Sequence, residues 1–306
     1  MLQLLRDIPE NPDQPTALAI GNFDGAHRGH AAVIAAMHKI AASQQLLPSV
    51  LTFEPHPRAY FSREAAPFRL IAPRSKWRAL QALGVARIYS LRFNAALASM
   101  PAERFVEAIL LQRLGAKAIV TGEDFCFGAK RRGNVAMLRD YGAAHGVTVE
   151  TVGALAHAGE VVSSSAIRAA LSAGDMAHVA TLLGRAYTLS GHVARGDGRG
   201  RGLGFATANV TLPRGVMLPP LGVYAVTVTG LGPGVANLGL RPSFAGGTAP
   251  RLEVHLFDLD RDLYGQRLEV AFHAFLRPER RFEDVQALVA QIEADAATAR
   301  VLLSAC

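Results

Sequence analysis

Apolar and polar positions follow two different patterns along the chain. In the first part, short apolar runs of strand length alternate with segments that have helical spacing. The predicted strands are residues 16–20, 48–53, 86–91, 117–121 and 147–152, and the predicted helices are residues 31–40, 73–83, 102–114, 135–144 and one that opens within 161–168. Strands that alternate with helices predict a parallel, doubly wound α/β sheet.

After Arg185 the pattern changes to alternating β-branched residues and glycine-rich turns. Short helical pieces, punctuated by Gly174 and Gly184, lead up to this change. The predicted strands are then residues 189–194, 208–212, 223–229, 234–240, 251–257 and 268–275, with no helix until 282–303. Several short strands at close spacing predict a small antiparallel β-barrel or sandwich. We therefore predict two domains, residues 1–185 and 186–306.

The closing helix carries apolar residues at helical spacing. These residues are Val285, Leu288, Val289 and Ile292. An apolar stripe of this kind predicts a face that packs on the barrel rather than a site for a partner.

Composition narrows the classes of protein and of ligand. The chain of 306 residues fits two domains, and half of it is hydrophobic, which supports a sizeable core. The net charge of +7 favours anionic partners, either nucleic acid or small phosphorylated ligands. No apolar stretch of about 20 residues predicts a membrane span, and residues 1–15 lack the pattern of a secretory signal. Cys126 and Cys306 make no disulfide framework, so we expect a cytoplasmic protein.

A glycine-rich turn joins the strand at 16–20 to the following helix. Its sequence is Gly21-Asn22-Phe23-Asp24-Gly25-Ala26-His27-Arg28-Gly29-His30. Such a turn directs main-chain N–H groups and the helix dipole toward an anion. His27 and His30 share one helix face and are predicted to stabilise charge on phosphate oxygens in a transition state. Arg28 occupies the position where a zinc protease helix has Glu, which argues against metal hydrolysis.

Two further loops follow predicted strands. Pro55 and His56 lie in Glu54-Pro55-His56-Pro57, where two prolines predict a stiff turn rather than a helix. Loops at strand ends are where α/β folds build ligand sites, although an ordinary Pro-rich connection fits equally. Phe125 and Phe127, after Asp124, fit the walls of a pocket for a planar ring, or two core aromatics. A basic cluster follows, at Lys130, Arg131 and Arg132, which suits a solvated loop or phosphates.

A run of serines opens the helix within 161–168. Ser163, Ser164 and Ser165 precede Arg168, which lies about one helical turn into the helix. Serine at this position is first of all an N-cap. Hydroxyls, exposed N–H groups and a guanidinium could instead surround a triphosphate.

The second domain has its own candidate site. Residues 195–204 combine five glycines with three arginines, including Arg195, Gly198 and Gly202, and predict a loop that binds phosphates. The loop lacks the Gly-Lys-Ser/Thr ending of a P-loop. Thr207 and Asn209 follow two residues apart on a predicted strand, so both can hold Mg²⁺ and phosphate. Glu253, amid apolar strand residues, is either a functional carboxylate or the partner of Arg241 or Arg251.

These motifs resemble known families in the right order along nearly the whole chain. Residues 21–30, followed by Ser-Ser-Ser-Ala-Ile-Arg at 163–168, resemble the nucleotidyltransferase superfamily with its Rossmann-like fold, and in particular the bacterial bifunctional riboflavin kinase/FAD synthetase family. Residues 204–209, 222–224, 236–244 and 252–257 resemble the riboflavin kinase module. Residue 206 is Ala where that module usually has Pro, which removes a fixed φ before Thr207.

The resemblance implies two ATP-dependent reactions. The barrel would phosphorylate riboflavin to FMN, with Arg195–Gly204 on phosphates, Thr207 and Asn209 on Mg²⁺, and Glu253 as the general base. The first domain would adenylylate FMN to FAD and release pyrophosphate. Its residues for ATP would be Gly21, Asn22, Phe23, Gly29, Ser163, Ser164 and Arg168, with His27 and His30 as the catalytic pair. Its residues for the flavin would be Pro55, His56, Asp124, Phe125 and Phe127.

The ligands implied are ATP, riboflavin, FMN and FAD, with Mg²⁺ as the partner of ATP at both sites. Neither nucleic acid nor a membrane is expected, and a homo-oligomer is left open. Two alternatives stand at this point. One is a different nucleotidyltransferase, of the pantetheine-phosphate or nicotinamide type, whose barrel is passive. The other is a basic RNA-binding protein that uses the Gly-Arg loop, for which tight and steeply salt-dependent RNA binding is expected.

Overall fold

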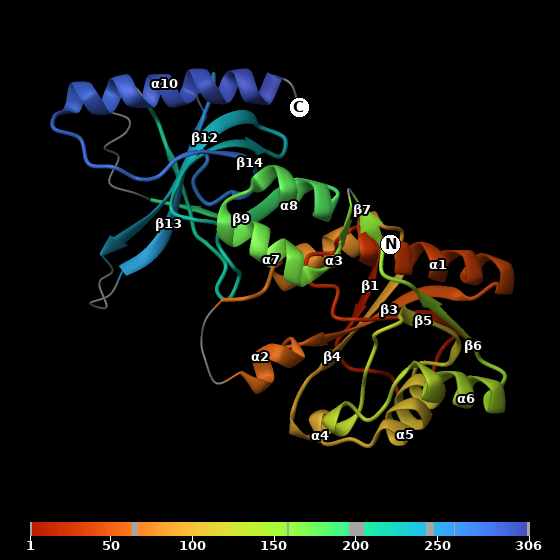
Figure 1. Cartoon of the computed structure of the whole chain (residues 1–306). Coiled ribbons are helices and arrows are strands. Elements are labelled where there is room, and N and C mark those ends of the chain that lie inside the picture. Colours follow the sequence, from red (N-terminus) through yellow and green to blue (C-terminus); the bar gives the residue numbers. More distant parts are fainter. Residues whose placement is uncertain are drawn as a thin grey trace. The chain divides into compact units, whose positions relative to one another are not determined.

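The computed structural model describes residues 2–62, 67–157, 159–195, 205–242, 248–259 and 261–304. The chain forms two compact units (Figure 1). The first comprises Met1–Ala66 and Pro73–Ser163, and the second comprises Pro67–Ala72 and Ser164–Cys306. No helix among the described residues is both long and apolar enough to cross a lipid bilayer.

The first unit is built on a six-stranded sheet in the order β1-β4-β3-β2-β5-β6, and all of its strand pairs are parallel. The strands are β1 (Gln3–Leu5), β2 (Thr16–Ile20), β3 (Leu47–Glu54), β4 (Arg87–Arg92), β5 (Ala116–Gly122) and β6 (Thr148–Val152). The helices are α1 (Arg28–Gln44), α2 (Pro57–Phe61), α3 (Pro73–Ala82), α4 (Ala95–Ala98), α5 (Ala102–Arg104), the π-helical η1 (Phe105–Arg113), the 3₁₀ turn η2 (Ala129–Arg131) and α6 (Val135–His145). A short antiparallel pair, β7 (Ala156–His157) and β8 (Glu160–Val161), completes the unit.

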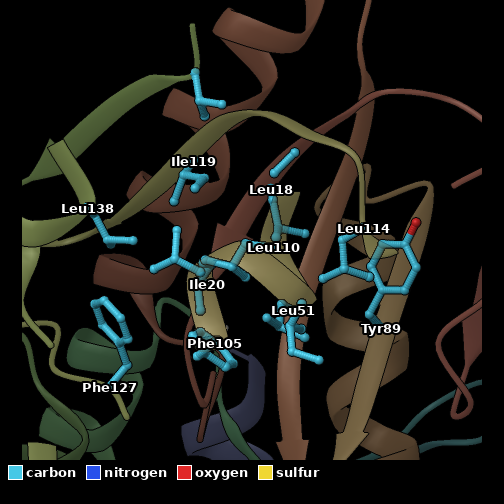
Figure 2. Packing of buried hydrophobic residues seen from close by; sticks show 14 of the residues in the cluster. Leu18, Ile20, Leu51, Tyr89, Phe105, Leu110, Leu114, Ile119, Phe127 and Leu138 are labelled. Atoms are coloured by element: carbon cyan, nitrogen blue, oxygen red, sulfur yellow. The ribbon is translucent and has the colours of Figure 1, made fainter. Parts of the chain in front are cut away.

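Helices cover both faces of this sheet, as the doubly wound prediction requires. Leu18 and Ile20 of β2 pack in one cluster with residues of η1 and α6, and Figure 2 shows them beside Leu110, Ile119 and Leu138. Ala17 and Ala19 face the other way, into a cluster formed with α1 and α3. Because a parallel strand is buried on both faces, its sequence is a continuous apolar run, and this is why β2 was predictable to the residue.

The second unit contains a closed antiparallel barrel in the order β10-β13-β12-β11-β14-β9. Of the two architectures that the sequence predicted, the structure therefore confirms the barrel and not the sandwich. Its strands are β9 (Tyr187–Ala194), β10 (Ala208–Val210), β11 (Gly222–Val228), β12 (Gly232–Pro242), β13 (Thr248–Leu256) and β14 (Arg267–Arg277). Its helices are α7 (Ser164–Ala173), α8 (Met176–Leu183) and α10 (Val285–Ser304). The barrel interior is filled by buried apolar side chains such as Tyr224 and Phe272, whose ring centroids lie 5.1 Å apart.

Helix α10 covers the outer face of the barrel, and three of the four residues of the predicted stripe, Leu288, Val289 and Ile292, are partly buried. Val285 is 57% exposed, whereas the buried positions of the helix are Asp295 and Ala299. Ala299 packs with Val223 of β11, and Arg277 of β14 donates from Nη2 to Asp295 over 2.8 Å. The buried face of the helix therefore leaves out Val285 and extends further toward the end of the helix than the predicted stripe.

Two other elements differ from the sequence-based expectations. Helix α2 begins at Pro57, in the segment for which the prolines predicted a turn without helix. A proline at the first helical position costs nothing, because the N–H group it lacks has no partner in the first turn. The strand β1 was not predicted, since its three residues are too few to show a period.

The predicted domain boundary at residues 185/186 stays a prediction. It follows the change from mixed to purely β pattern in the sequence. The compact units divide instead at Ser163/Ser164, because α7 packs on α8 and α8 contacts the strands β9 and β14.

Candidate functional site

The turn between β2 and α1 carries the predicted phosphate-binding residues of the first unit. Phe23, Gly25 and Ala26 have φ angles of 50°, 88° and 44°, in the left-handed region that glycine enters without steric cost. The Phe23 ring is 1% exposed, and a Cβ added to Gly21 would lie 3.3 Å from it. The buried ring therefore fixes the path of the chain where it enters α1.

His27 and His30 form a reciprocal cap at the start of α1. The His30 N–H donates to Nδ1 of His27 over 3.4 Å, and the His27 N–H donates to Nδ1 of His30 over 3.3 Å. The rings stack with centroids 3.6 Å apart. Because each Nδ1 accepts a hydrogen bond, the neutral rings carry their proton on Nε2. The pair thus presents two Nε2–H donors at a helix N-terminus, where anions are favoured.

Asn22 lies in this turn at the carboxyl end of β2. Its main-chain carbonyl accepts a hydrogen bond from Thr52 Oγ1 over 3.2 Å. Its side-chain Oδ1 is buried and has no hydrogen-bond partner among the described residues. A buried polar atom without a partner is costly, so an incoming ligand or its metal ion is the natural partner for this oxygen.

The predicted second signature is split between the two units. Val162, which directly precedes Ser163, lies over the turn: its carbonyl oxygen would be 3.5 Å from a Cβ added to Gly29. Helix α7 begins at Ser164, as predicted. In the second unit Arg168 donates from Nε to the carbonyl of Phe68 over 2.8 Å. A phosphate site shared by Arg168 and the histidine pair stays a prediction.

The predicted flavin-binding loops follow neighbouring parallel strands. Pro55 and His56 come directly after β3, and Asp124 follows β5 in an exposed position. Since β3, β2 and β5 are adjacent and parallel, these loops and the turn at Asn22 leave the same edge of the sheet. Ligands bind at this edge in open α/β sheets. His56 itself caps α2, accepting the Arg58 N–H at Nδ1 over 3.1 Å.

The two phenylalanines of the same group have a structural role. Phe127 is buried in the core cluster of the first unit, beside Phe105 with ring centroids 5.6 Å apart, and Figure 2 shows both rings. Phe125 stacks on Phe127 at 5.5 Å and is partly buried against the same cluster. These contacts support the core interpretation for Phe127 and leave Phe125 with part of its surface outside the core.

Lys76 of α3 lies at this edge of the sheet and was not among the predicted site residues. It is 4% exposed, and its Nζ donates to the Asn22 carbonyl over 3.2 Å. The signal in the sequence was its position four residues before Leu80, which places both on the buried face of the helix. Charged residues on such a face are rare unless they are paired.

The second candidate set lies on the outer face of the barrel. Glu253 of β13 is directly opposite Asn209 of β10 and Asn237 of β12. The residues on either side of Glu253 in β13, Leu252 and Val254, are buried in the interior of the barrel. The Cα atoms of directly opposed residues in antiparallel strands lie about 4.5–5.5 Å apart. The three polar side chains therefore form one row across three adjacent strands.

Asn237 and Glu279 extend this row and were missed from the sequence. Asn237 Nδ2 donates to Glu279 Oε1 over 3.1 Å. Its Oδ1 is buried without a hydrogen-bond partner in the described part of the chain. A Cβ added to Gly239 would overlap Glu279 Oε1, so the absence of a side chain at Gly239 makes room for the carboxylate. The strand register and this hydrogen bond bring the group together, since its members are far apart in sequence.

Thr207 directly precedes β10 and follows Ala206. The carbonyl of Ala206 accepts a hydrogen bond from Nδ1 of His255 over 2.9 Å. His255 is two residues from Glu253 on β13, so it tethers the segment that leads into Thr207 and Asn209. This tether holds the backbone at Ala206, where no proline ring fixes φ.

The donor set at this position suits a hard divalent cation. Hydroxyl and amide oxygens, as in Thr207 and Asn209, together with phosphate oxygens are typical Mg²⁺ ligands. Among the described residues no group of three His, Cys, Asp or Glu side chains could hold a metal ion alone. The oxygens of Thr207 and Asn209 fit a cation that arrives with the phosphates of a nucleotide.

The predicted phosphate loop is described only at its first residue. Arg195 is exposed and follows Ala194, which pairs with Asn209. Gly198 and Gly202 lie outside the described residues.

Comparisons with known proteins match both parts of the chain. Residues 10–166 match the family model for FAD synthetase, and residues 183–303 match the model for riboflavin kinase. The chain is similar to the bifunctional riboflavin kinase/FMN adenylyltransferase of Escherichia coli K12, with 39% identity over 98% of this chain and 96% of the relative. It is also similar to that of Pseudomonas fluorescens, with 42% identity over 98% of each chain. A crystal structure named as the macrolide-efflux protein of Streptococcus pneumoniae has 28% identity, covers 98% of this chain and 99% of its own, and gives a TM-score of 0.87.

Proposed function

This chain belongs to the bifunctional riboflavin kinase/FMN adenylyltransferase family, and from that premise we propose how its residues divide the two reactions. The enzyme phosphorylates riboflavin to FMN with ATP and then adenylylates FMN to FAD. Two groups of candidate residues support the division, one that centres on the turn between β2 and α1 and one on the outer face of the barrel. Both family models match the chain. This match argues against the two alternative functions, which are a different nucleotidyltransferase with a passive barrel and a basic RNA-binding protein.

The adenylyl transfer takes place at the turn between β2 and α1. A phosphate oxygen of FMN attacks the α-phosphorus of ATP, the bond to the bridging oxygen breaks, and pyrophosphate leaves. The Nε2–H groups of His27 and His30 donate to phosphate oxygens whose charge grows in the transition state. Asn22 binds the triphosphate of ATP together with the neighbouring residues Gly21, Phe23 and Gly29.

The remaining groups of this site bind the ends of the two substrates. Ser163 and Ser164 offer hydroxyl groups and the N-terminus of α7 to the β- and γ-phosphates, and Arg168 offers its guanidinium. Asp124, with the loop at Pro55 and His56, receives the flavin at the edge of the sheet. Phe125 supplies its outward surface to the ring system, while Phe127 supports it from the core.

The kinase reaction takes place on the outer face of the barrel. Glu253 removes the proton from the ribityl 5′-hydroxyl, the hydroxyl oxygen attacks the γ-phosphorus, and ADP leaves. Arg195 and the loop that contains Gly198 and Gly202 surround the phosphates. Asn237, held by Glu279, accepts a hydrogen bond from a substrate hydroxyl. Phosphoryl transfer depends mainly on positioning and charge neutralisation, and this set supplies both.

Enzymes of these families use ATP with a divalent metal ion, and we propose Mg²⁺ as that ion in both steps. Thr207 and Asn209 would hold it in the barrel, where it would neutralise phosphate charge. Because ATP is supplied in the cytoplasm, we propose that compartment for the enzyme. Its ligands are ATP, riboflavin, FMN and FAD, without nucleic acid or membrane. We retain 1–185 and 186–306 as the proposed functional domains.

One observation carries the adenylyl assignment: the reciprocal cap that orients two imidazoles at the helix N-terminus. The test is incubation of the purified chain with riboflavin, ATP and Mg²⁺, followed by chromatographic separation of the flavins. FMN should form first and FAD later. Riboflavin that stays chemically unchanged would contradict the assignment.

A further inference from the structure

Lys76 is a buried cation bound by oxygens from two strand ends. Its Nζ donates to the Asn22 carbonyl over 3.2 Å, to Thr52 Oγ1 over 3.1 Å and to Glu54 Oε1 over 2.9 Å. Burying an ammonium group costs several kcal/mol unless it is paired and hydrogen-bonded. These three oxygens offset that cost at this position.

The contacts of Lys76 join two loops that the reaction uses. Asn22 belongs to the turn after β2, and Glu54 is the last residue of β3, directly before Pro55 and His56. The first loop is assigned to ATP and the second to FMN. One ammonium group therefore connects the two substrate loops at the carboxyl edge of the sheet.

The same contacts determine how Asn22 is held. Its carbonyl accepts from both Thr52 Oγ1 and Lys76 Nζ, so its main chain is anchored by two donors behind the turn. With the main chain held in this way, the side-chain Oδ1 is buried and lacks a partner among the described residues. A ligand group is then required to satisfy that oxygen.

We propose that Lys76 is a positioning residue for adenylyl transfer, because it fixes the spacing between the ATP turn and the FMN loop. In-line attack needs the FMN phosphate and the α-phosphorus at close range, and a displacement of about 1 Å can cost two orders of magnitude in rate. The proposal rests on the assignment of the adenylyl site to the turn after β2. A simpler role, in which Lys76 only neutralises Glu54, leads to different results in the experiment below.

The experiment measures kcat and the KM values for ATP and FMN in FAD formation. Its variants are Lys76→Met, Lys76→Arg, the double variant Lys76→Met/Glu54→Gln, and Lys39→Met. Lys39 is an exposed lysine of α1 in the same unit and serves as the matched control. Riboflavin phosphorylation by the same samples reports on concentration and on folding of the barrel, where that reaction takes place, and thermal unfolding of each variant reports on folding of the unit that contains Lys76.

We expect Lys76→Met to lower kcat/KM for FAD formation at least tenfold and to raise the KM of at least one substrate. Riboflavin phosphorylation should stay within twofold of the wild type, as should both activities of Lys39→Met. Lys76→Arg should recover part of the loss. The double variant should stay impaired, because removing the charge of Glu54 does not restore the donor to Asn22.

Three results would overturn the proposal. The first is FAD formation by Lys76→Met within twofold of the wild type. The second is a fall in kcat alone that matches a loss of folded protein, with both KM values unchanged. The third is full recovery in the double variant. His30→Ala serves as the reference: if it still forms FAD, the site assignment itself fails, whereas a normal Lys76→Met beside an inactive His30→Ala rejects only the role of Lys76.

Discussion

His27 and His30 cap each other, since each main-chain N–H donates to the Nδ1 of the other ring. The same two side chains thus begin helix α1 and are fixed in the tautomer that directs an Nε2–H away from the cap. Glutamine at the third helical position can also reach back to the N-cap N–H. Structural and chemical roles of the pair can therefore be separated by substitution.

His30→Gln should keep the cap and remove the imidazole. We expect FAD formation from FMN to fall about 10²- to 10³-fold, the usual cost of one lost transition-state donor. The thermal midpoint should change little, and riboflavin phosphorylation should continue. Kinetics of both reactions in one preparation measure this. An active His30→Gln would mean that the ring only caps the helix.

Glu253→Gln should have the opposite selectivity. Loss of a general base lowers the rate about 10²- to 10⁴-fold, so FMN formation should nearly stop, while FAD formation from added FMN continues. Glu293→Gln, at an exposed position of α10, is the matched control and should keep both activities. If Glu253 instead serves only as an ion partner, the variant should lose stability before it loses kinase rate.

Asn209→Ala should change the metal dependence of the kinase reaction alone. Because the amide oxygen is a proposed Mg²⁺ ligand, we expect the Mg²⁺ concentration for half-maximal FMN formation to rise roughly tenfold or more. A chelator should stop both reactions of the wild type, and added Mg²⁺ should restore both. An unchanged Mg²⁺ titration of FMN formation would remove Asn209 from the metal site.

His255→Ala tests the tether on the segment that leads into Thr207. Losing one hydrogen bond worth about 0.5–1.5 kcal/mol should raise the KM for ATP in FMN formation about two- to tenfold. FAD formation should not change. Ala206→Pro in the same background should recover part of the loss, since a proline ring restores the fixed φ. No change in either kinetic constant would show that the tether is dispensable.

Asp13 and Arg87 predict a pH effect on stability. Arg87 is 3% exposed and donates from Nη2 to Asp13 Oδ2 over 2.7 Å, and this hydrogen bond lowers the pKa of Asp13. A lowered pKa stabilises the fold above about pH 4, the range of a free Asp, and the gain is lost as the pH falls through the folded value. Because Asp13 is largely exposed, we expect Asp13→Asn to cost only about 1 kcal/mol at neutral pH. Urea unfolding at pH 7 and pH 3 should show the difference between the two proteins shrinking in acid.

Much of the fold was predictable because its signals are local. Thr16–Ile20 is buried on both faces and bounded by glycine, so one apolar run identified the strand and its ends. The barrel strands were predictable from alternation and glycine-rich turns. In contrast, β1 is too short for any period, and the two prolines around His56 obscured a helix that begins at the second of them.

The candidate sites were predictable where their chemistry is contiguous in the sequence. His27 and His30 lie at one helix start, and Thr207 and Asn209 lie two residues apart at the start of β10. Lys76, Asn237 and Glu279 were missed because their partners come from distant segments. Phe125 and Phe127 have the same residue type and spacing as a pocket wall, and only packing shows that Phe127 belongs to the core.

The row formed by Asn209, Asn237 and Glu253 exists only when the strands β10, β12 and β13 are paired in the observed register. A shift by one residue turns every side chain of a strand to the opposite surface, which would send Glu253 into the hydrophobic interior. Catalytic competence in this half of the molecule is therefore an all-or-none property of the assembled sheet. During refolding, riboflavin phosphorylation should reappear when the barrel closes. The time course of this reaction should therefore follow the formation of the native barrel.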